Sequence, residues 1–151
     1  MLQTKIPPPL YMLIFAALMW LLDKYMPVSH WVSPGWQVLA WGIIALGVLI
    51  DLSSMGLFIR KGTSPNPFQP KKASQLISTG LYRFTRNPMY LGMLVLLAGW
   101  AIHLGGLTPI VLLPLFVITL TTFQIKPEEQ ALEAIFGQEY RDYKKRVRRW
   151  V

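Results

Sequence analysis

Residues 87–125, NPMYLGMLVLLAGWAIHLGGLTPIVLLPLFVITLTTFQI, contain no charged side chain. A helix needs about 20 apolar residues to cross a bilayer, so this stretch is too long for one crossing and too apolar for a loop. The pair Gly105-Gly106, followed by Pro109, predicts a break in its middle. We therefore expect residues 88–104 and 107–125 to form an antiparallel helical hairpin.

Two further apolar segments precede this hairpin. Residues 6–22 carry no charge, and within them the apolar stretch 10–22 follows the run Pro7-Pro8-Pro9, which suits a helix start. No small-residue cleavage pattern of a signal peptide follows. Residues 36–59 form the second segment, with Asp51 as its single acid, and Arg60-Lys61 end it. The sequence predicts an all-α, polytopic membrane protein with about four transmembrane helices, in one domain over residues 1–151.

The composition is 53% hydrophobic and 15% charged, with a net charge of +8. Four crossings place fourteen of the fifteen basic residues on one side, Lys24 being the exception, which the positive-inside rule assigns to the cytoplasm. Both termini are then cytoplasmic. The absence of cysteine excludes disulfides and thiolate chemistry, and only two histidines argue against a metal site.

The loop at residues 74–92, SQLISTGLYRFTRNPMYLG, is one of the two most patterned parts of the chain. Asn87 stands where an N-cap is expected before Pro88. One interpretation is a capped helix start with Arg83 and Arg86 facing lipid phosphates. The other is a site for an anionic group, made by exposed amides, the helix dipole and the same arginines.

The second patterned part is residues 126–151. Pro127 followed by Glu128, Glu129 and Glu133 is typical of a helix N-terminus. Apolar residues then recur at helical spacing, which predicts an amphipathic cytoplasmic helix lying on the membrane surface or on the hairpin, with a basic end that meets anionic headgroups. Lipid binding does not explain Glu128 and Glu129, because acidic side chains are not expected where a membrane span meets the negatively charged lipid surface.

These two segments resemble the isoprenylcysteine carboxyl methyltransferase family. The matching residues are Gly80-Leu81-Tyr82, Arg86-Asn87-Pro88-Met89-Tyr90-Leu91-Gly92, the apolar hairpin, Glu128-Glu129 and Phe136-Gly137-Gln138-Glu139-Tyr140 with Tyr143. Integral-membrane phospholipid methyltransferases share the signature more loosely. The resemblance covers about half of the chain, and the first two spans match only in being hydrophobic.

The resemblance implies an enzyme, an S-adenosylmethionine-dependent methyltransferase that holds its cofactor between cytoplasmic helix ends in segments 74–92 and 126–143. No G-x-G-x-x-G loop is present in the sequence. Carried over by position, the implied cofactor contacts are Gln75, Leu76, Ile77, Tyr82, Asn87, Pro88, Met89, Tyr90 and Glu128. Apolar side chains suit adenine, a carboxylate suits the ribose hydroxyls and the amine, and Tyr90 can face the sulfonium by cation–π attraction.

The sequence constrains the methyl acceptor less than the cofactor. Asn87 replaces a histidine of eukaryotic members, and Gln124 stands where they carry an arginine suited to a carboxylate. Asp51, deep in its span, is expected to line a lipid-substrate tunnel, and Glu129 or Asp51 are the candidate bases for an amine acceptor. The leading hypothesis is methyl transfer to a lipidic or isoprenoid-like acceptor at the cytoplasmic face, including a carboxylate that gives a methyl ester.

Two alternatives accompany that hypothesis. Phospholipid N-methylation uses the same cofactor with a different nucleophile. A non-catalytic, lipid-binding membrane scaffold would need only the basic tail, and it leaves Glu128, Glu129 and the Asn87-Pro88 pair unexplained. Membrane lipids are the expected partners, and nucleic acid is not, because the basic residues lie beside membrane spans without a recognised binding motif. The sequence leaves the oligomeric state open.

Overall fold

A computed structural model describes residues 6–30, 34–62 and 75–151. All regular elements in these ranges are helical, which confirms the predicted all-α class. Lys5, Lys71, Lys72 and Ser74, which entered the charge argument and the loop pattern, lie outside the described residues. In chain order the helices are α1 (Pro8–Tyr25), α2 (Pro34–Arg60), η2 (Gly80–Arg83), α3 (Pro88–Leu104), η3 (Thr108–Val111), α4 (Leu112–Leu120), η4 (Thr121–Ile125), α5 (Lys126–Phe136) and α6 (Gln138–Arg146).

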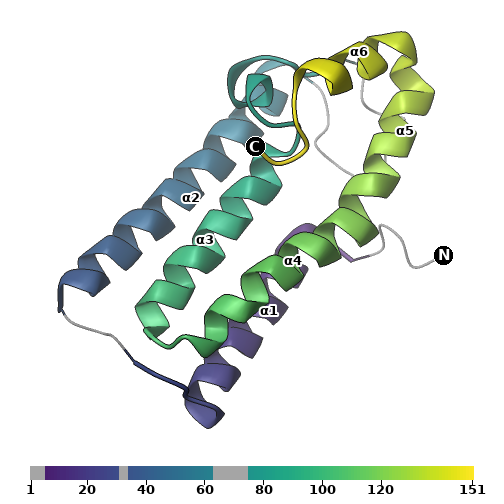
Figure 1. Ribbon diagram of the computed structural model, residues 1–151. Coiled ribbons are helices and arrows are strands. Elements are labelled where there is room, and N and C mark those ends of the chain that lie inside the picture. Colours follow the sequence, from purple (N-terminus) through teal and green to yellow (C-terminus); the bar gives the residue numbers. More distant parts are fainter. Residues whose placement is uncertain (1–5, 31–33, 63–74) are drawn as a thin grey trace.

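The hairpin breaks where the glycine pair predicts. Helix α3 ends at Leu104, and Gly105 follows it in the left-handed conformation, with φ at 80°. That conformation is easy for glycine and strained for other residues, so it ends the helix and reverses the chain. The return begins with the short 3-10 helix η3 and continues as α4, which lies beside α3 (Figure 1).

Two helices are long and apolar enough to cross a membrane, Gly35–Arg60 and Thr108–Phe136, and α3 is apolar but shorter. Large apolar side chains are exposed along α2, with Val38 76% and Leu52 64% exposed. Water would not favour such a surface, whereas lipid would, so this surface fits a membrane protein. We take the spanning part of the second helix as residues 108–125, because Lys126, Glu128 and Glu129 then follow within four residues.

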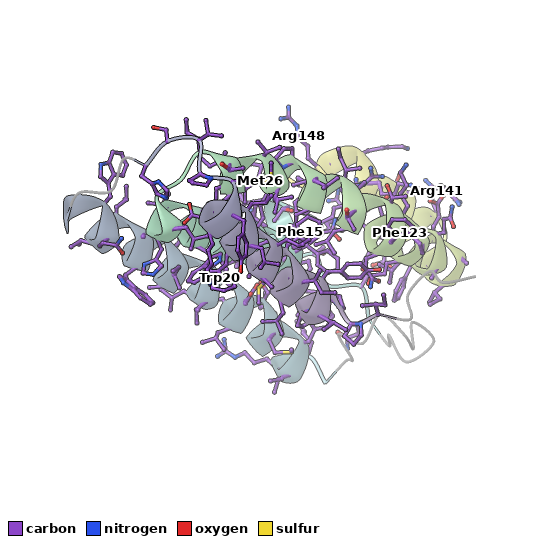
Figure 2. The ribbon with its side chains drawn as sticks, turned by 90° about the horizontal axis from the view of Figure 1, so that it is seen from below. Phe15, Trp20, Met26, Phe123, Arg141 and Arg148 are labelled. Atoms are coloured by element: carbon purple, nitrogen blue, oxygen red, sulfur yellow. The ribbon has the colours of Figure 1, made fainter. Side chains whose placement is uncertain are left out.

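The core joins α1, α3 and α4 (Figure 1). Phe15 of α1 meets Phe116 of α4 edge to face, with ring centroids 5.2 Å apart. The indole of Trp100 in α3 donates a hydrogen bond to the carbonyl of Ala16, at 3.0 Å. Figure 2 shows Phe15 in the interior of the bundle, consistent with its 6% exposure.

Helix α2 packs along α3 at a distance that only glycine allows. A Cβ atom added at Gly47 would lie 2.9 Å from the backbone oxygen of Gly92 and from the backbone nitrogen of Leu96. A Cβ at Gly99 would lie 2.7 Å from a side-chain carbon of Ile44. Small residues at such positions let two helix backbones approach closely, which is a frequent mode of helix packing in membranes.

The C-terminal segment differs from the single amphipathic helix that its pattern predicts. It forms two helices, α5 and α6, which Gly137 separates at φ 55°. Pro127 does not start a helix either, because α4 runs through η4, a π-helical turn, straight into α5. A proline ring crowds the carbonyl four residues earlier, here Phe123, and the wider π-turn at that place accommodates it.

Gly47→Ala should destabilise the protein by about 1–3 kcal/mol, because the added methyl group meets backbone atoms of α3 that cannot move aside. Gly42→Ala, on the same helix, is the matched control: nothing lies within 4 Å of its added Cβ. We expect it to be neutral or slightly stabilising. Thermal unfolding of both variants in the same detergent measures the difference, and equal melting temperatures would contradict the close approach of the two helices.

Candidate active site

The site is built where the chain enters α3. Thr85 pairs with Arg148 in a parallel bridge, and the backbone N–H of Arg86 donates to the carbonyl of Arg148, at 2.9 Å. The Thr85 hydroxyl and the Asn87 side-chain amide both donate to the carbonyl of Arg149, at 3.1 and 3.0 Å. The C-terminal segment after α6 is thereby fixed against the start of α3.

This arrangement corrects the expectation that Asn87 caps α3. Asn87 holds the N-cap position, but its side chain makes no capping hydrogen bond. Its amide group is engaged with the Arg149 carbonyl instead. Pro88 tolerates the uncapped start, because a proline at the first helical position has no N–H to satisfy.

Glu129 is a buried carboxylate held by two arginines. Its Oε1 accepts a hydrogen bond from Arg86 Nη2 at 2.6 Å, and its Oε2 accepts one from Arg149 Nη2 at 2.7 Å. The side chains of Glu129 and Arg86 are 7% and 9% exposed. The second terminal nitrogen of Arg86 donates to the carbonyls of Lys144 and Val147, at 3.1 and 2.9 Å. Arg86 therefore faces the protein interior and not lipid phosphates, whereas Arg83 is exposed.

The two arginines decide the ionisation of Glu129. Burial by itself raises the pKa of the carboxyl, but the hydrogen bonds from Arg149 and Arg86 outweigh burial and hold the pKa below its usual value. Both oxygens are occupied by guanidinium donors, so the geometry favours a structural role for Glu129 over proton transfer.

The neighbouring Glu128 has a different environment. Its Oε1 accepts a hydrogen bond from the Tyr90 hydroxyl at 2.5 Å. Burial raises the pKa of Glu128 to about 7; the bond from Tyr90 lowers it, and the charge of Glu129 raises it further. Tyr90 is 7% exposed, on the first turn of α3. A carboxyl that can be neutral or ionised near neutral pH thus lies beside a buried phenol.

Aromatic residues of α6 complete the site from the other side. The Tyr143 hydroxyl donates to the backbone carbonyl of Tyr82 at 2.7 Å. An apolar cluster surrounds this contact, made by Tyr140, Tyr143 and Val147 with Leu76, Leu132 and Phe136 packed against it. Burial raises the pKa of the Tyr82 hydroxyl, and Tyr143, Glu128 and Asp51 raise it further. Glu128 and Asp51 therefore act on the same phenol from two different helices.

The structure gathers most of the predicted cofactor residues at one end of the bundle, where α3 starts and α5 and α6 lie (Figure 1). Ile77, Tyr82, Pro88 and Tyr90 are buried there, Leu76, Met89, Asn87 and Glu128 are partly buried, and Gln75 is exposed. Gln124 lies one turn before Glu128 on the same helix; it is fully buried and donates to the carbonyl of Ile6.

The role of Arg149 was not evident from the sequence. The tail of basic residues gives no local signal that separates it from its neighbours. Figure 2 shows Arg148 projecting outward, and Arg141 is also exposed on α6, whereas Arg149 turns inward to Glu129. The pairing joins residues 20 positions apart across the bend at Gly137, and the folded chain alone defines it.

A hollow of about 450 Å³ lies beside the site, between the end of α2 and η2. Its lining residues are Ser53, Gly56, Leu57, Arg60, Gly80 and Leu81. The volume is within the range of small-molecule sites, and the lining is mainly apolar. Among the described residues no group of three or more His, Cys, Asp or Glu side chains can hold a metal ion.

These features define a helical, apolar protein with a polar site at one end of its bundle. The family model of phospholipid methyltransferases matches residues 36–139, and the chain belongs to this family. This match supports the resemblance to membrane methyltransferases seen in the sequence.

Two relatives are similar in sequence. A protein-S-isoprenylcysteine O-methyltransferase of Schizosaccharomyces pombe is 28% identical over 115 residues, which are 74% of this chain and 48% of that protein. The chain thus spans about half the length of this relative. An uncharacterized protein of Haemophilus influenzae is 43% identical over 63 residues, which are 42% of this chain and all of that protein.

Glu129→Gln should destabilise the protein by about 3 kcal/mol or more, because it removes the buried carboxylate charge that pairs with the guanidinium groups of Arg86 and Arg149. Glu133→Gln is the matched control on the same helix. Glu133 pairs with Lys144 at the partly exposed surface, where such a pair contributes at most about 1 kcal/mol. Thermal unfolding in detergent at pH 7 compares the two, and a similar loss in both would contradict the cluster.

The stability difference between wild type and Glu129→Gln should also depend on pH. The folded-state pKa of Glu129 is lowered from 4.5, so its stabilising contribution is present above about pH 4.5 and disappears as pH falls through the folded-state pKa. Unfolding midpoints measured from pH 7 down to pH 3 should therefore converge. A difference that stays constant over this range would show that the carboxylate charge is not the cause.

Proposed function

We propose that this protein is an integral-membrane, S-adenosylmethionine-dependent methyltransferase that acts on a lipidic or isoprenoid-like acceptor. The observation that carries the proposal is the Tyr90–Glu128 pair, a buried phenol on a carboxyl of raised pKa, at the end of an apolar bundle. S-adenosylmethionine brings an ammonium and a sulfonium, two cations that a carboxylate and an aromatic ring can receive. The chain's membership of the phospholipid methyltransferase family also supports a methyltransferase function.

The cofactor would lie between segments 74–92 and 126–143. Leu76, Ile77 and Tyr82 offer an apolar slot and backbone groups for adenine. Glu128 would bind the ribose hydroxyls or the methionine amine, and the Tyr90 ring would face the sulfonium. Asn87, Pro88 and Met89 would contact the cofactor through the first turn of α3, and Gln75 from the surface.

The reaction is an in-line displacement. A lone pair of the acceptor forms a bond to the methyl carbon while the carbon–sulfur bond breaks, and its electron pair stays on sulfur. The protein's part is to align the nucleophile, the methyl carbon and the sulfur, and to exclude water. The ion cluster of Glu129, Arg86 and Arg149 serves this by fixing three chain segments around the site.

We also propose four membrane crossings, by α1, α2, α3 and the helix of residues 108–125, with both termini cytoplasmic. The charge distribution supports this topology, since the crossings place fourteen of fifteen basic residues on one side. The start of α3 and helices α5 and α6 then lie at the cytoplasmic face. A lipid acceptor would reach the site from the bilayer, and a water-soluble cofactor from the cytoplasm.

Purified protein in nanodiscs should bind S-adenosylmethionine. Glu128→Gln should weaken binding about tenfold or more by removing the carboxylate charge, and Tyr90→Ala should also weaken it by removing the ring that would face the sulfonium. A hydrogen bond to a charged group contributes about 1.5–3 kcal/mol, and 1.4 kcal/mol is a factor of ten in affinity. Glu139→Gln, an exposed glutamate of α6, should leave the affinity unchanged. Calorimetry measures all four proteins; no binding by the wild type would refute the proposed function.

The affinity for S-adenosylmethionine should rise with pH. The carboxyl of Glu128 has a pKa of about 7 without ligand, and a cationic ligand binds its ionised form. Below that pKa the protein must first lose a proton, so raising the pH from 5.5 to 7 should tighten binding about tenfold or more. In Glu128→Gln this dependence should be absent, which calorimetry at the two pH values tests.

A further inference from the structure

Asp51 is the one acid of the apolar helix α2. It lies in α2 nine residues before Arg60, about 13 Å along the helix axis from the end. Its Oδ1 is buried, and Asp51 makes no hydrogen bond or ion pair with any residue that the structure describes. An ionisable group at this depth is costly unless something satisfies it, and it usually faces a site inside the protein.

Helix α3 has a glycine where it faces Asp51. A Cβ atom added at Gly92 would overlap Oδ1 of Asp51. Gly92 follows Tyr90 by two residues, so Asp51 lies next to the first turns of α3, on the membrane side of the Tyr90–Glu128 pair. The missing side chain at Gly92 is what lets the carboxyl reach this position.

The same face of α2 reaches the predicted adenine slot. Phe58, two helical turns after Asp51, meets the Tyr82 ring edge to face, with centroids 5.6 Å apart. The Tyr82 hydroxyl is influenced by Asp51 from α2 and by Glu128 from α5. Asp51 in α2 and Glu128 in α5 are therefore both near enough to Tyr82 to act on its hydroxyl.

The charges around Asp51 restrict what can approach it. Residues 87–125 contain no Lys or Arg, and α2 has none before Arg60; His103 lies in the last turn of α3, eleven residues beyond Gly92. Arg86 is already engaged with Glu129, and Gln124 is neutral. An acceptor whose nucleophile is itself an anion would meet a like charge in a poorly solvated place, which is unfavourable. An acceptor whose nucleophile carries a proton would give Asp51 its missing hydrogen bond.

We propose that Asp51 contacts the methyl acceptor and receives its proton, and that the acceptor is an amphiphile with an amine or hydroxyl nucleophile. This inference rests on the proposed methyltransferase function. The nucleophile's lone pair forms the bond to the methyl carbon, and the carbon–sulfur bond breaks with its electron pair remaining on sulfur. The proton of the methylated nitrogen or oxygen passes to the Asp51 carboxylate and from there to solvent. S-adenosylhomocysteine and the neutral methylated amphiphile are the products.

The first test uses the wild-type protein in nanodiscs with methyl-labelled S-adenosylmethionine. Three probes with the same chain and different heads are supplied: hexadecylamine, hexadecanol and palmitate. We expect label in the amine or the alcohol, as a product stable to mild base, and none in palmitate. Label in a base-labile methyl ester of palmitate would overturn the inference. So would the absence of transfer to both other probes by protein that binds the cofactor.

The second test uses Asp51→Asn with the accepted probe. A positioned base contributes about 10²–10⁴-fold, so kcat should fall at least 100-fold while the Kd for S-adenosylmethionine stays within about twofold. At saturating S-adenosylmethionine, the pH profiles of kcat for wild type and variant should differ by the ionisation of this one carboxyl, which the variant lacks. Unchanged cofactor binding shows that the variant is folded. A variant with wild-type kcat and pH profile would refute the role of Asp51.

Ser54→Ala is the matched control, because Ser54 lies one turn after Asp51 on α2 and its hydroxyl donates to the Ile50 carbonyl of the same helix. It should keep the wild-type kcat, and a loss equal to that of Asp51→Asn would assign the effect to packing of this helix. The outcomes separate the two proposals. Failure of the wild type to bind S-adenosylmethionine refutes the proposed function, whereas binding with methyl transfer to palmitate refutes only the inference on Asp51.

Discussion

The ion cluster of Glu129 with Arg86 and Arg149 is the constraint on which the polar end of the bundle depends. One buried carboxylate binds two guanidinium groups that come from the entry into α3 and from the segment after α6. The ion cluster adds to the other contacts between these segments, which include side-chain hydrogen bonds from Thr85, Arg86 and Asn87 to backbone carbonyls, the Tyr90–Glu128 pair and one apolar cluster. Because Glu129 takes both arginines, the adjacent Glu128 has neither, and two neighbouring carboxyls acquire opposite pKa shifts.

The π-turn in the last long helix sets the directions in which the Glu128 and Glu129 side chains point. The π-turn at Thr121–Ile125 holds one residue more than an α-helical turn, and one residue corresponds to a rotation of about 100° in the helix that follows. Glu128 thereby meets Tyr90, and Glu129 meets Arg86. π-turns are frequent at functional sites, and here the proline at position 127 gives a local reason for one.

The membrane-embedded part follows a different principle. Glycines at positions 47, 92 and 99 bring α2 against α3, and the same close packing leaves room for the Asp51 carboxyl. At Gly92 the absent side chain leaves the space that the Asp51 carboxyl occupies. The protein therefore has acids in two places, Glu128 and Glu129 in α5 and Asp51 between α2 and α3.

The sequence by itself determined the helical class, the bounds of α3, the break at Gly105 and the two segments that form the site. These follow from local signals: apolar runs, glycine pairs and motif spacing. Through resemblance it also proposed candidate cofactor residues, which stay a prediction, but it gave no sign of the bend at Gly137, which a continuous amphipathic pattern conceals. Only the tertiary structure decided that Arg86 and Arg149 bind Glu129, that Asn87 holds the C-terminal segment, and that Gly92 faces Asp51. These partners are 20 to 62 residues apart, and identical side chains in the same segments differ only in which neighbour the folded chain brings to them.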